Sequence, residues 1–329
     1  MRNATKNMKS GIAVAGNILV DKINEISAYP QSGELTQIHA VVSATGGLVP
    51  NVAVDLKRLH PALTVKAVGK VGVDSEGEFA KKVLEENGVE TACVKTADIP
   101  TSFTQVMSVV GGQRTFFTYA GASADFGAND VDFDALNVKM FHLGYFLLLK
   151  KMDEGDGVKT LKKAKEAGVE TSIDLVSENS TRYQAVLPCL PYTDNLIINE
   201  IEAGHLTGMQ PTAENLRAMA EKLMRLGVRK RVIIHMVDVG VCLSENGFFY
   251  LPSYQLPKGF IKGTTGAGDA FCAGALLGIY QEKSEMDILR LATISATGAL
   301  MSADAISGMK SVEELQDICK NLERKNICL

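Results

Sequence analysis

A short glycine-rich stretch, GTTGAGDAF at residues 263–271, places one carboxylate directly after three glycines and before an apolar segment. Glycine lets the backbone turn tightly and approach a ligand, and free N–H groups at a helix start bind anions. The stretch therefore indicates an anion site with Asp269 beside it. The alternative is a glycine turn with an ordinary capping carboxylate, because acids are favoured in a first turn. The stretch is not a P-loop, because no Lys-Ser or Lys-Thr follows its last glycine. It is not a dinucleotide-binding fingerprint either, because Phe271 stands where the third glycine would be.

Two further stretches combine turn residues with polar side chains. Gly46 and Gly47 precede Asn51 at the start of a predicted helix, for which Asn51 is also a candidate cap. Asn199 and Glu202 follow an apolar strand, and their spacing places an amide and a carboxylate on one helical face. Oxygen ligands of these kinds suit a hydrated Mg²⁺ near phosphates, and the alternative is an ordinary cap between strand and helix.

The order of apolar segments predicts a layered α/β fold. From about residue 130, short β-branched runs alternate with amphipathic stretches that end on glycine. This alternation is typical of parallel strands joined by helices, so we expect a mostly parallel sheet with helices on both faces. The C-terminal quarter is predicted to be helical, with a last helix over residues 312–324.

The N-terminal third differs from the rest of the chain. Residues 18–45 and 101–121 alternate like strands, and the second segment is typical of a β-hairpin turning at Gly111 and Gly112. We infer one domain over residues 1–329, with these two segments forming a small β-sheet that projects from the main core.

Composition narrows the class of partner. The 329 residues carry a formal net charge of −4 without a long basic run, so the footprint expected of a nucleic-acid or membrane-surface binder is missing. No apolar run approaches the roughly 20 residues of a membrane span. A small molecule is the expected partner.

The cysteines and histidines suggest no metal site. The six cysteines form no C-x-x-C pair and have no histidine at ligand spacing, which suits a reducing cytoplasm and predicts neither a structural zinc nor disulfides. His142 and His235 lie within apolar strands and are expected to be hydrogen-bonded core residues.

Together the motifs resemble one known family. The stretches GGLVPNVA (46–53), NEIEA (199–203) and TTGAGDAF (264–271), in this order on an α/β background, are similar to motifs of the ribokinase-like (PfkB-type) carbohydrate kinases. Weaker matches extend the resemblance to about residues 11–310. It implies a three-layer α/β/α core with a small β lid, and transfer of the γ-phosphoryl group of ATP to a sugar or nucleoside hydroxyl.

The resemblance also implies the catalytic residues. Asp269 is the implied base for the acceptor hydroxyl, and the backbone N–H groups of Gly266, Ala267 and Gly268 are the implied anion hole for the γ-phosphoryl group. A carboxylate is an adequate base because the proton leaves late in a loose transition state.

Cofactor sites are implied in the same way. The residues matching the family's nucleotide and metal positions are Asn199, Glu202, Thr265 and Gly240. Asn199 and Glu202 are expected to hold Mg²⁺ beside ATP, partly through water.

The residues implied to bind the acceptor are Asp21, Gly46, Gly47, Asn51 and Arg114. Asp and Asn side chains suit a polyol, because vicinal hydroxyls offer donors and acceptors together. Arg114 lies on the predicted lid hairpin, where a solvated surface arginine is the alternative. The lid is expected to close over the acceptor and, as in relatives, to pair with a second subunit in a homodimer.

Three positions depart from the family pattern. Gly263 stands where many relatives have an aspartate that helps hold a monovalent cation, so K⁺ activation is not expected. Leu48 replaces a polar residue of ribose-specific members, and Gly144 falls about where those members have an acidic ribose ligand. A site that loses such groups is not expected to be strictly ribose-specific.

We therefore predict a cytoplasmic, ATP- and Mg²⁺-dependent kinase for a hydroxyl, expected to be primary, of a monosaccharide or sugar derivative. A nucleoside kinase stays open, because a base needs apolar or aromatic walls. The residues that offer such walls are Leu48, Phe103, Phe117 and Tyr145. A sugar-binding protein with the same fold but without catalytic activity is a third possibility, although the presence of Asp269 and its glycine loop argues against it.

Overall fold

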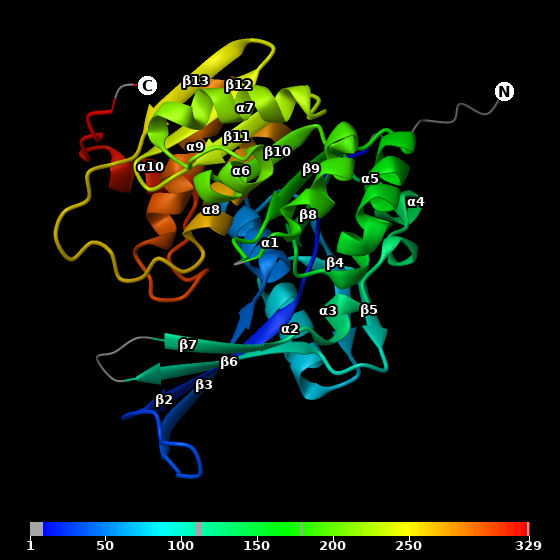
Figure 1. Cartoon of the computed structure of the whole chain (residues 1–329), viewed down its shortest axis with the longest axis vertical. Coiled ribbons are helices and arrows are strands. Elements are labelled where there is room, and N and C mark those ends of the chain that lie inside the picture. Colours follow the sequence, from blue (N-terminus) through cyan, green and yellow to red (C-terminus); the bar gives the residue numbers. More distant parts are fainter. Residues whose placement is uncertain (1–8, 110–113, 179, 328) are drawn as a thin grey trace.

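The protein is described here by a computed structural model that covers residues 9–109, 114–178, 180–327 and 329. Nine strands form the core sheet, in the order β13-β12-β11-β10-β9-β8-β1-β4-β5 (Figure 1). The strands are β1 (Ile12–Ala15), β4 (Val65–Gly72), β5 (Glu90–Ala97), β8 (Met140–Phe146), β9 (Glu170–Leu175), β10 (Asn195–Asn199), β11 (Arg231–His235), β12 (Val239–Ser244) and β13 (Gly247–Pro252). Neighbours from β11 to β5 are parallel, and β12 and β13 add an antiparallel edge. The predicted mostly parallel sheet is confirmed.

Helices cover both faces of this sheet. One hydrophobic cluster joins it to α1 (Leu48–Leu59), α2 (Ser75–Glu86), α8 (Ala267–Tyr280), α9 (Glu285–Ala299) and α10 (Val312–Cys319). A second cluster joins the opposite face to α4 (Phe133–Leu136), α5 (Gly157–Glu166), α6 (Glu200–Thr207) and α7 (Leu216–Arg225). The short helix α3 (Gly121–Ala124) follows the second sheet described below. The three-layer α/β/α core expected from the resemblance is therefore confirmed.

Local signals explain where the helices nearest the site begin. The side chain of Asp74 accepts the N–H of Gly77 at 2.8 Å and caps α2, and Ser284 caps α9 in the same manner. Helix α8 is different, because every residue from 269 to 279 is buried. It is a central helix packed between α1 and α9, so its first turn is held rigidly.

A second sheet projects from the core at the bottom of Figure 1, in the order β3-β2-β6-β7. Its strands are β2 (Leu19–Ile26), β3 (Ile38–Gly46), β6 (Ser102–Val109) and β7 (Arg114–Tyr119). These strands lie in the two segments predicted to form a small β-sheet, and β6 and β7 pair antiparallel as a hairpin should. The predicted turn at Gly111 and Gly112 lies outside the described residues.

The C-terminal helix is shorter than predicted. Instead of running over 312–324, α10 ends at Cys319. The guanidinium of Arg324 donates to the carbonyl oxygen of Pro252 at 2.5 Å and to the hydroxyl of Tyr254 at 3.0 Å, and Arg324 forms a β-bridge with Tyr254. These long-range contacts hold the last residues extended, which local periodicity does not reveal.

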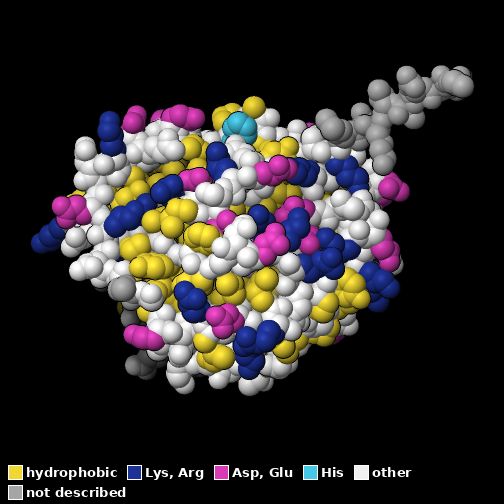
Figure 2. Space-filling view, turned by 90° about the horizontal axis from the view of Figure 1, so that it is seen from above, with side chains coloured by type: hydrophobic (Ala, Val, Ile, Leu, Met, Phe, Trp, Pro, Cys, Tyr) yellow, Lys and Arg dark blue, Asp and Glu magenta, His cyan; other side chains and the backbone are white. Residues whose placement is uncertain are grey.

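On the face shown in Figure 2, basic and acidic side chains are interspersed among hydrophobic ones. Within the described part of the chain, no helix combines the length and the hydropathy that crossing a bilayer would require.

One carboxylate in the core lacks a compensating contact. Asp55 of α1 is 0% exposed, and neither of its oxygens has a hydrogen-bond partner among the described residues. Burial raises the pKa of Asp55 well above its usual range, and the nearby acids Asp269 and Asp304 raise it further while Arg58 lowers it. A buried carboxyl of this kind is stable when neutral, so Asp55 binds its proton more tightly in the folded chain than in the unfolded one.

This linkage predicts the effect of Asp55→Asn. A carboxyl whose pKa is higher in the folded chain than in the unfolded chain stabilises the fold. This stabilisation is fully present below the unfolded pKa, and it is lost as pH rises through the folded pKa. The Asn side chain does not titrate, so the variant does not lose this stability. Its free energy of unfolding, relative to that of the wild type, should therefore increase by up to about 1.4 kcal/mol per pH unit as pH rises above about 4. Denaturant unfolding at several pH values measures this difference.

Asp304→Asn is the matched control. Asp304 accepts the N–H groups of Ile306 and Ser307, and its pKa is lowered despite partial burial, so its own titration lies below a pH of about 4 and its removal should have the opposite sign in that range only. A difference between Asp55→Asn and the wild type that stays constant with pH would contradict the buried neutral carboxyl.

Candidate active site

Asp269 lies in the first turn of α8 and is 6% exposed. Its carboxylate accepts the side-chain N–H of Asn51 on Oδ2 at 2.8 Å and the hydroxyl of Tyr145 on Oδ1 at 2.8 Å. Burial raises the pKa of Asp269 to about 6, although both hydrogen bonds lower it. The carboxylate is therefore ionised at neutral pH with a pKa close to it, which suits a general base better than a capping group.

The glycine turn before Asp269 requires its glycine. Gly266 is the N-cap residue of α8 with φ of 78°, in the left-handed region, and a Cβ there would lie 2.7 Å from Cα of Ala305. No side chain among the described residues caps this helix start. The N–H groups of Gly266 and Gly268 have no partner among the described residues and can meet an anion, whereas the N–H of Ala267 donates to the carbonyl oxygen of Thr264 at 3.3 Å.

Asn51 is not the cap of its helix. Gly47 is the N-cap residue of α1, and the side-chain oxygen of Asn17 accepts the N–H of Leu48 at 2.9 Å. Asn51 lies one turn further on, where its amide donates to Asp269. The capping role considered for Asn51 is wrong, and the side chain of Asn17 binds the helix start in its place.

Asn199 and Glu202 form a capping box at the start of α6. The Asn199 side chain accepts the N–H of Glu202 at 2.9 Å, and the Glu202 carboxylate accepts the N–H of Asn199 at 3.0 Å and the hydroxyl of Ser177 at 3.0 Å. Burial raises the pKa of Glu202 to about 8. Asn199 and Glu202 therefore do cap the helix, which was the alternative to a metal-binding role. Both residues also line the cavity at Asp269.

These two residues fit a metal held through water. Glu202 is 3% exposed and would be ionised by a nearby cation, and carboxylate and amide oxygens are ligands that Mg²⁺ accepts. Among the described residues the pair belongs to no cluster of three His, Cys, Asp or Glu ligands, so it offers no complete protein cage.

Two cavities meet beside the glycine turn. The smaller has a volume of about 200 Å³ and reaches Asp269 and Tyr145, and the larger, of about 580 Å³, extends along α9 and the 253–256 segment. Three residues line both cavities: Asn199, His235 and Gly268. A ligand that spans both cavities passes over the first turn of α8.

His235 is not a fully buried core histidine. It is half-buried between the two cavities, and its ring lies 4.8 Å from that of Phe271. Its desolvated position lowers the pKa of His235 to about 4, so the imidazole is neutral. His142 is fully buried, as expected for a core histidine.

The remaining predicted residues lie at different distances from this centre. Asp21 stands on β2, and a side chain at Gly46 would clash with its carboxylate. Thr265, Gly240 and Arg114 line neither cavity: Thr265 lies in the turn between two lining residues, Gly240 packs against the ring of Phe271, and Arg114 is exposed on β7.

Asp174 is a residue of the site that the sequence did not reveal. It stands on β9 and lines the smaller cavity, and its carboxylate occupies the space that a side chain at Gly144 would need. Tyr145 was considered as an apolar wall, but its hydroxyl contacts Asp269. Asp174 and Tyr145 lie near the carboxyl ends of parallel strands, where ligands of such sheets bind, and that is the signal by which they could be found.

Known proteins share this architecture. The model of the pfkB family carbohydrate kinase matches residues 9–311. Ribokinase of Arabidopsis thaliana is 27% identical over 328 residues, covering 95% of this chain and 84% of that protein. Fructokinase-1 of Oryza sativa subsp. japonica is 27% identical over 282 residues, covering 82% of this chain and 83% of that protein.

The solved structures agree at the level of fold. The structure of Arabidopsis thaliana ribokinase complexed with ribose and ATP superposes with a TM-score of 0.83 at 24% identity, covering 95% of this chain and 99% of that one. With a family model that spans most of its length, the chain belongs to the pfkB family of carbohydrate kinases.

Proposed function

We propose that this protein transfers the γ-phosphoryl group of ATP to a hydroxyl, expected to be primary, of a monosaccharide or sugar derivative. The observation that carries the proposal is Asp269, a carboxylate with a pKa of about 6 held at an uncapped helix start between two joined cavities. The proposed setting is the cytoplasm, which suits the five described cysteines, all of them free.

Asp269 is proposed to act as the base. An acceptor hydroxyl in the smaller cavity passes its proton to the carboxylate as the oxygen attacks the γ-phosphorus. Asn51 and Tyr145 fix the carboxylate through their hydrogen bonds of 2.8 Å, which keeps one orientation toward the acceptor. Holding the hydroxyl beside its base is the main rate contribution that such a site makes.

The first turn of α8 is proposed to bind the transferring phosphoryl group. The backbone N–H groups of Gly266, Ala267 and Gly268 and the positive end of the helix dipole meet the charge that develops on its oxygens. Mg²⁺, held partly through water by Asn199 and Glu202, would neutralise the phosphate chain when bound. Its charge would also keep the Glu202 carboxyl ionised.

The larger cavity is proposed to hold the nucleotide. Its apolar part includes Phe271 and Ile261, and Lys325 supplies one positive charge at its edge. Since Asn199, His235 and Gly268 are common to both cavities, the phosphates of ATP can pass from this cavity to Asp269. Thr265 and Gly240 would then act through the backbone near the phosphates rather than by lining the cavity.

The projecting sheet is proposed to be a lid on a single domain that spans residues 1–329. It carries Asp21, Gly46 and Arg114 on or beside its strands, so closing it would bring these residues to the acceptor and exclude water. Burial raises the pKa of Asp21, although a hydrogen bond from Thr104 lowers it. Asp21 and Asn51 are the proposed partners of the acceptor's hydroxyl groups.

A nucleoside acceptor is the second candidate. The rings of Phe103 and Tyr119 on the lid lie 5.3 Å apart and tilted, an arrangement on which a base could stack. The carboxylates of Asp269, Asp174 and Asp21 favour a polyol, and they would repel an acceptor that carries a negative charge.

A coupled assay of ADP release tests the proposal. The panel contains neutral hexoses, neutral pentoses, keto-deoxy sugar acids and nucleosides, each with Mg²⁺ and ATP, and a reaction without acceptor measures hydrolysis. We expect a neutral monosaccharide to raise ADP release at least tenfold above the reaction without acceptor. Highest turnover with a nucleoside would select the second candidate, and no stimulation by any acceptor would contradict both.

The same assay in Na⁺ and in K⁺ salts tests the cation expectation. A Cβ at Gly263 would lie 2.8 Å from the carbonyl oxygen of Ser302, so the position has no space for the aspartate of relatives. Equal rates in the two salts are expected, and strong stimulation by K⁺ would mean that other groups bind the cation.

We also propose that the lid pairs with a second copy of the chain. The strand β7 is exposed along its whole length, and Phe116 is 62% exposed while Val41 of β3 is 62% exposed. Large apolar side chains on a projecting sheet are a feature of interaction surfaces.

Light scattering tests the pairing. The wild type should have the mass of a dimer, and Phe116→Lys should shift it toward the monomer because a charge is buried in the contact. Val237→Lys, which changes an 81% exposed valine outside the lid, is the matched control and should leave the mass unchanged. A monomeric wild type would rule out the pairing.

A further inference from the structure

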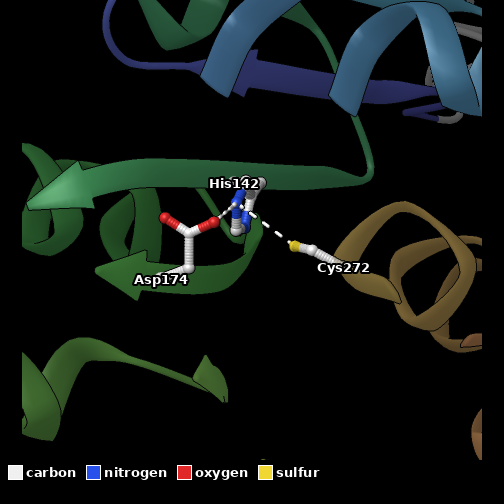
Figure 3. Close-up of side chains that lie close together, drawn as sticks. All are labelled: His142, Asp174 and Cys272. Atoms are coloured by element: carbon white, nitrogen blue, oxygen red, sulfur yellow. Dashed lines mark hydrogen bonds and ion pairs between the residues drawn. The ribbon is translucent and has the colours of Figure 1, made fainter. Parts of the chain in front are cut away.

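Three side chains to which the proposed reaction gives no catalytic step meet behind Asp269. They are His142 of β8, Asp174 of β9 and Cys272 of α8, and Figure 3 shows the imidazole of His142 between the other two groups. All three are buried, with exposed fractions of 0%, 6% and 2% in that order. They are the one group of three or more possible metal ligands found in the described part of the chain.

One distance within this cluster is long for a hydrogen bond between nitrogen and oxygen. Nε2 of His142 lies 3.3 Å from Oδ2 of Asp174 and 3.6 Å from Sγ of Cys272, and the three ligand atoms lie within 4.8 Å of one another. An N–H···O hydrogen bond is normally about 2.9 Å long, so the first contact is a weak one. In tetrahedral zinc sites, bond lengths near 2.1 Å to N and O and 2.3 Å to S separate neighbouring ligands by about 3.3 to 3.6 Å, which matches the two pairs that include His142. The third pair, Asp174 and Cys272, lies within 4.8 Å.

The orientation of His142 also fits a ligand. Nδ1 lies 2.9 Å from the hydroxyl of Ser172, which can accept its N–H and leave the lone pair of Nε2 facing the cluster. A second-sphere hydrogen bond of this kind fixes the tautomer of metal-binding histidines. Burial lowers the pKa of His142 to about 3, so the imidazole is neutral, as a ligand must be.

Only one oxygen of Asp174 faces this cluster. Oδ2 lies against His142, whereas Oδ1, which has no hydrogen-bond partner among the described residues, points toward Gly144. A buried carboxylate is costly, and a cation bound at Oδ2 would reduce that cost.

An entry path and an open coordination position exist. Asp174 and Cys272 line the smaller cavity together with Tyr145 and Asp269, while His142 is fully buried and does not line it. A metal on the three ligands would therefore keep its fourth position toward this cavity, where water can occupy it.

We propose that His142 Nε2, the Asp174 carboxylate and Cys272 Sγ form a Zn²⁺ site. Burial raises the pKa of the Cys272 thiol and of the Asp174 carboxyl, so Zn²⁺ displaces the protons of both groups to solvent as the Zn–S and Zn–O bonds form. Mg²⁺ does not substitute, because it prefers oxygen ligands to thiolate and imidazole. Cys272 follows Asp269 by three residues on α8, so the metal lies one helical turn from the proposed base. The site does not depend on the proposed kinase activity.

Metal binding to the purified, metal-free full-length protein tests the site. Titration with Zn²⁺ against a competing chromophoric chelator should show one tight site per chain in the wild type. Cys272→Ala should lose that site, with affinity lower by at least 10²-fold, while Cys242→Ala, which changes another buried cysteine, should keep it. With Co²⁺ as a spectroscopic probe, thiolate-to-cobalt absorption should appear in the wild type and in Cys242→Ala and be absent from Cys272→Ala.

A second variant separates metal binding from a folding defect. Asp174→Asn keeps the shape of the side chain and should weaken Zn²⁺ at least tenfold while the thiolate absorption with Co²⁺ persists at saturation. Circular dichroism of each metal-free variant checks its fold. A wild type without a tight zinc site, or equal zinc affinity in the wild type and a folded Cys272→Ala, would overturn the proposal.

Discussion

The first turn of α8 holds a buried carboxylate beside the backbone N–H groups at which we propose that an anion binds. Asp269 stays ionisable there because Asn51 and Tyr145 donate hydrogen bonds to it from two different elements, α1 and β8. The glycine turn before it needs the left-handed conformation of Gly266 and its close contact with Ala305. Sheet, helix and C-terminal loop must therefore all be in place before the base and the proposed anion hole face one cavity.

Acidic side chains gather around this point. Burial raises the pKa of each of four nearby carboxyls: Asp55, Asp174, Glu202 and Asp269. A site proposed to receive the phosphates of ATP next to such groups needs compensating positive charge. The helix start supplies part of it, Mg²⁺ near Glu202 would supply more, and the proposed zinc on His142 would neutralise Asp174 and Cys272. Asp55 needs no compensating cation, because it is buried in its neutral form.

Much of the fold could be predicted from the sequence, because strand and helix periods are local properties. The alternation after residue 130 indicated the parallel sheet, and the two N-terminal segments indicated the second sheet. The short α10 could not be predicted, since Arg324 is held by contacts with residues about seventy positions away. Of the site, the motif residues Asp269, Asn199 and Glu202 were identified by type and spacing.

The hidden parts of the site depend on which strands become neighbours. Asp174 belongs to no local motif, and only the pairing of β8 with β9 brings it to one cavity with Tyr145. The sequence spacing also predicted no zinc site, because His142 and Cys272 are 130 positions apart. Asn51 was assigned to the acceptor by resemblance, whereas the hydrogen bond to Asp269 gives it a positioning role that only the packing of α1 on α8 makes visible.

The most direct measurement is single-turnover phosphoryl transfer by Asp269→Asn, with ATP binding measured on the same preparation. The variant keeps the shape of the side chain and the glycine turn but cannot accept a proton. The account predicts ATP affinity within a few fold of the wild type and transfer to the acceptor slower by a factor of about 10² to 10⁴. Transfer at the wild-type rate would show that the base lies elsewhere.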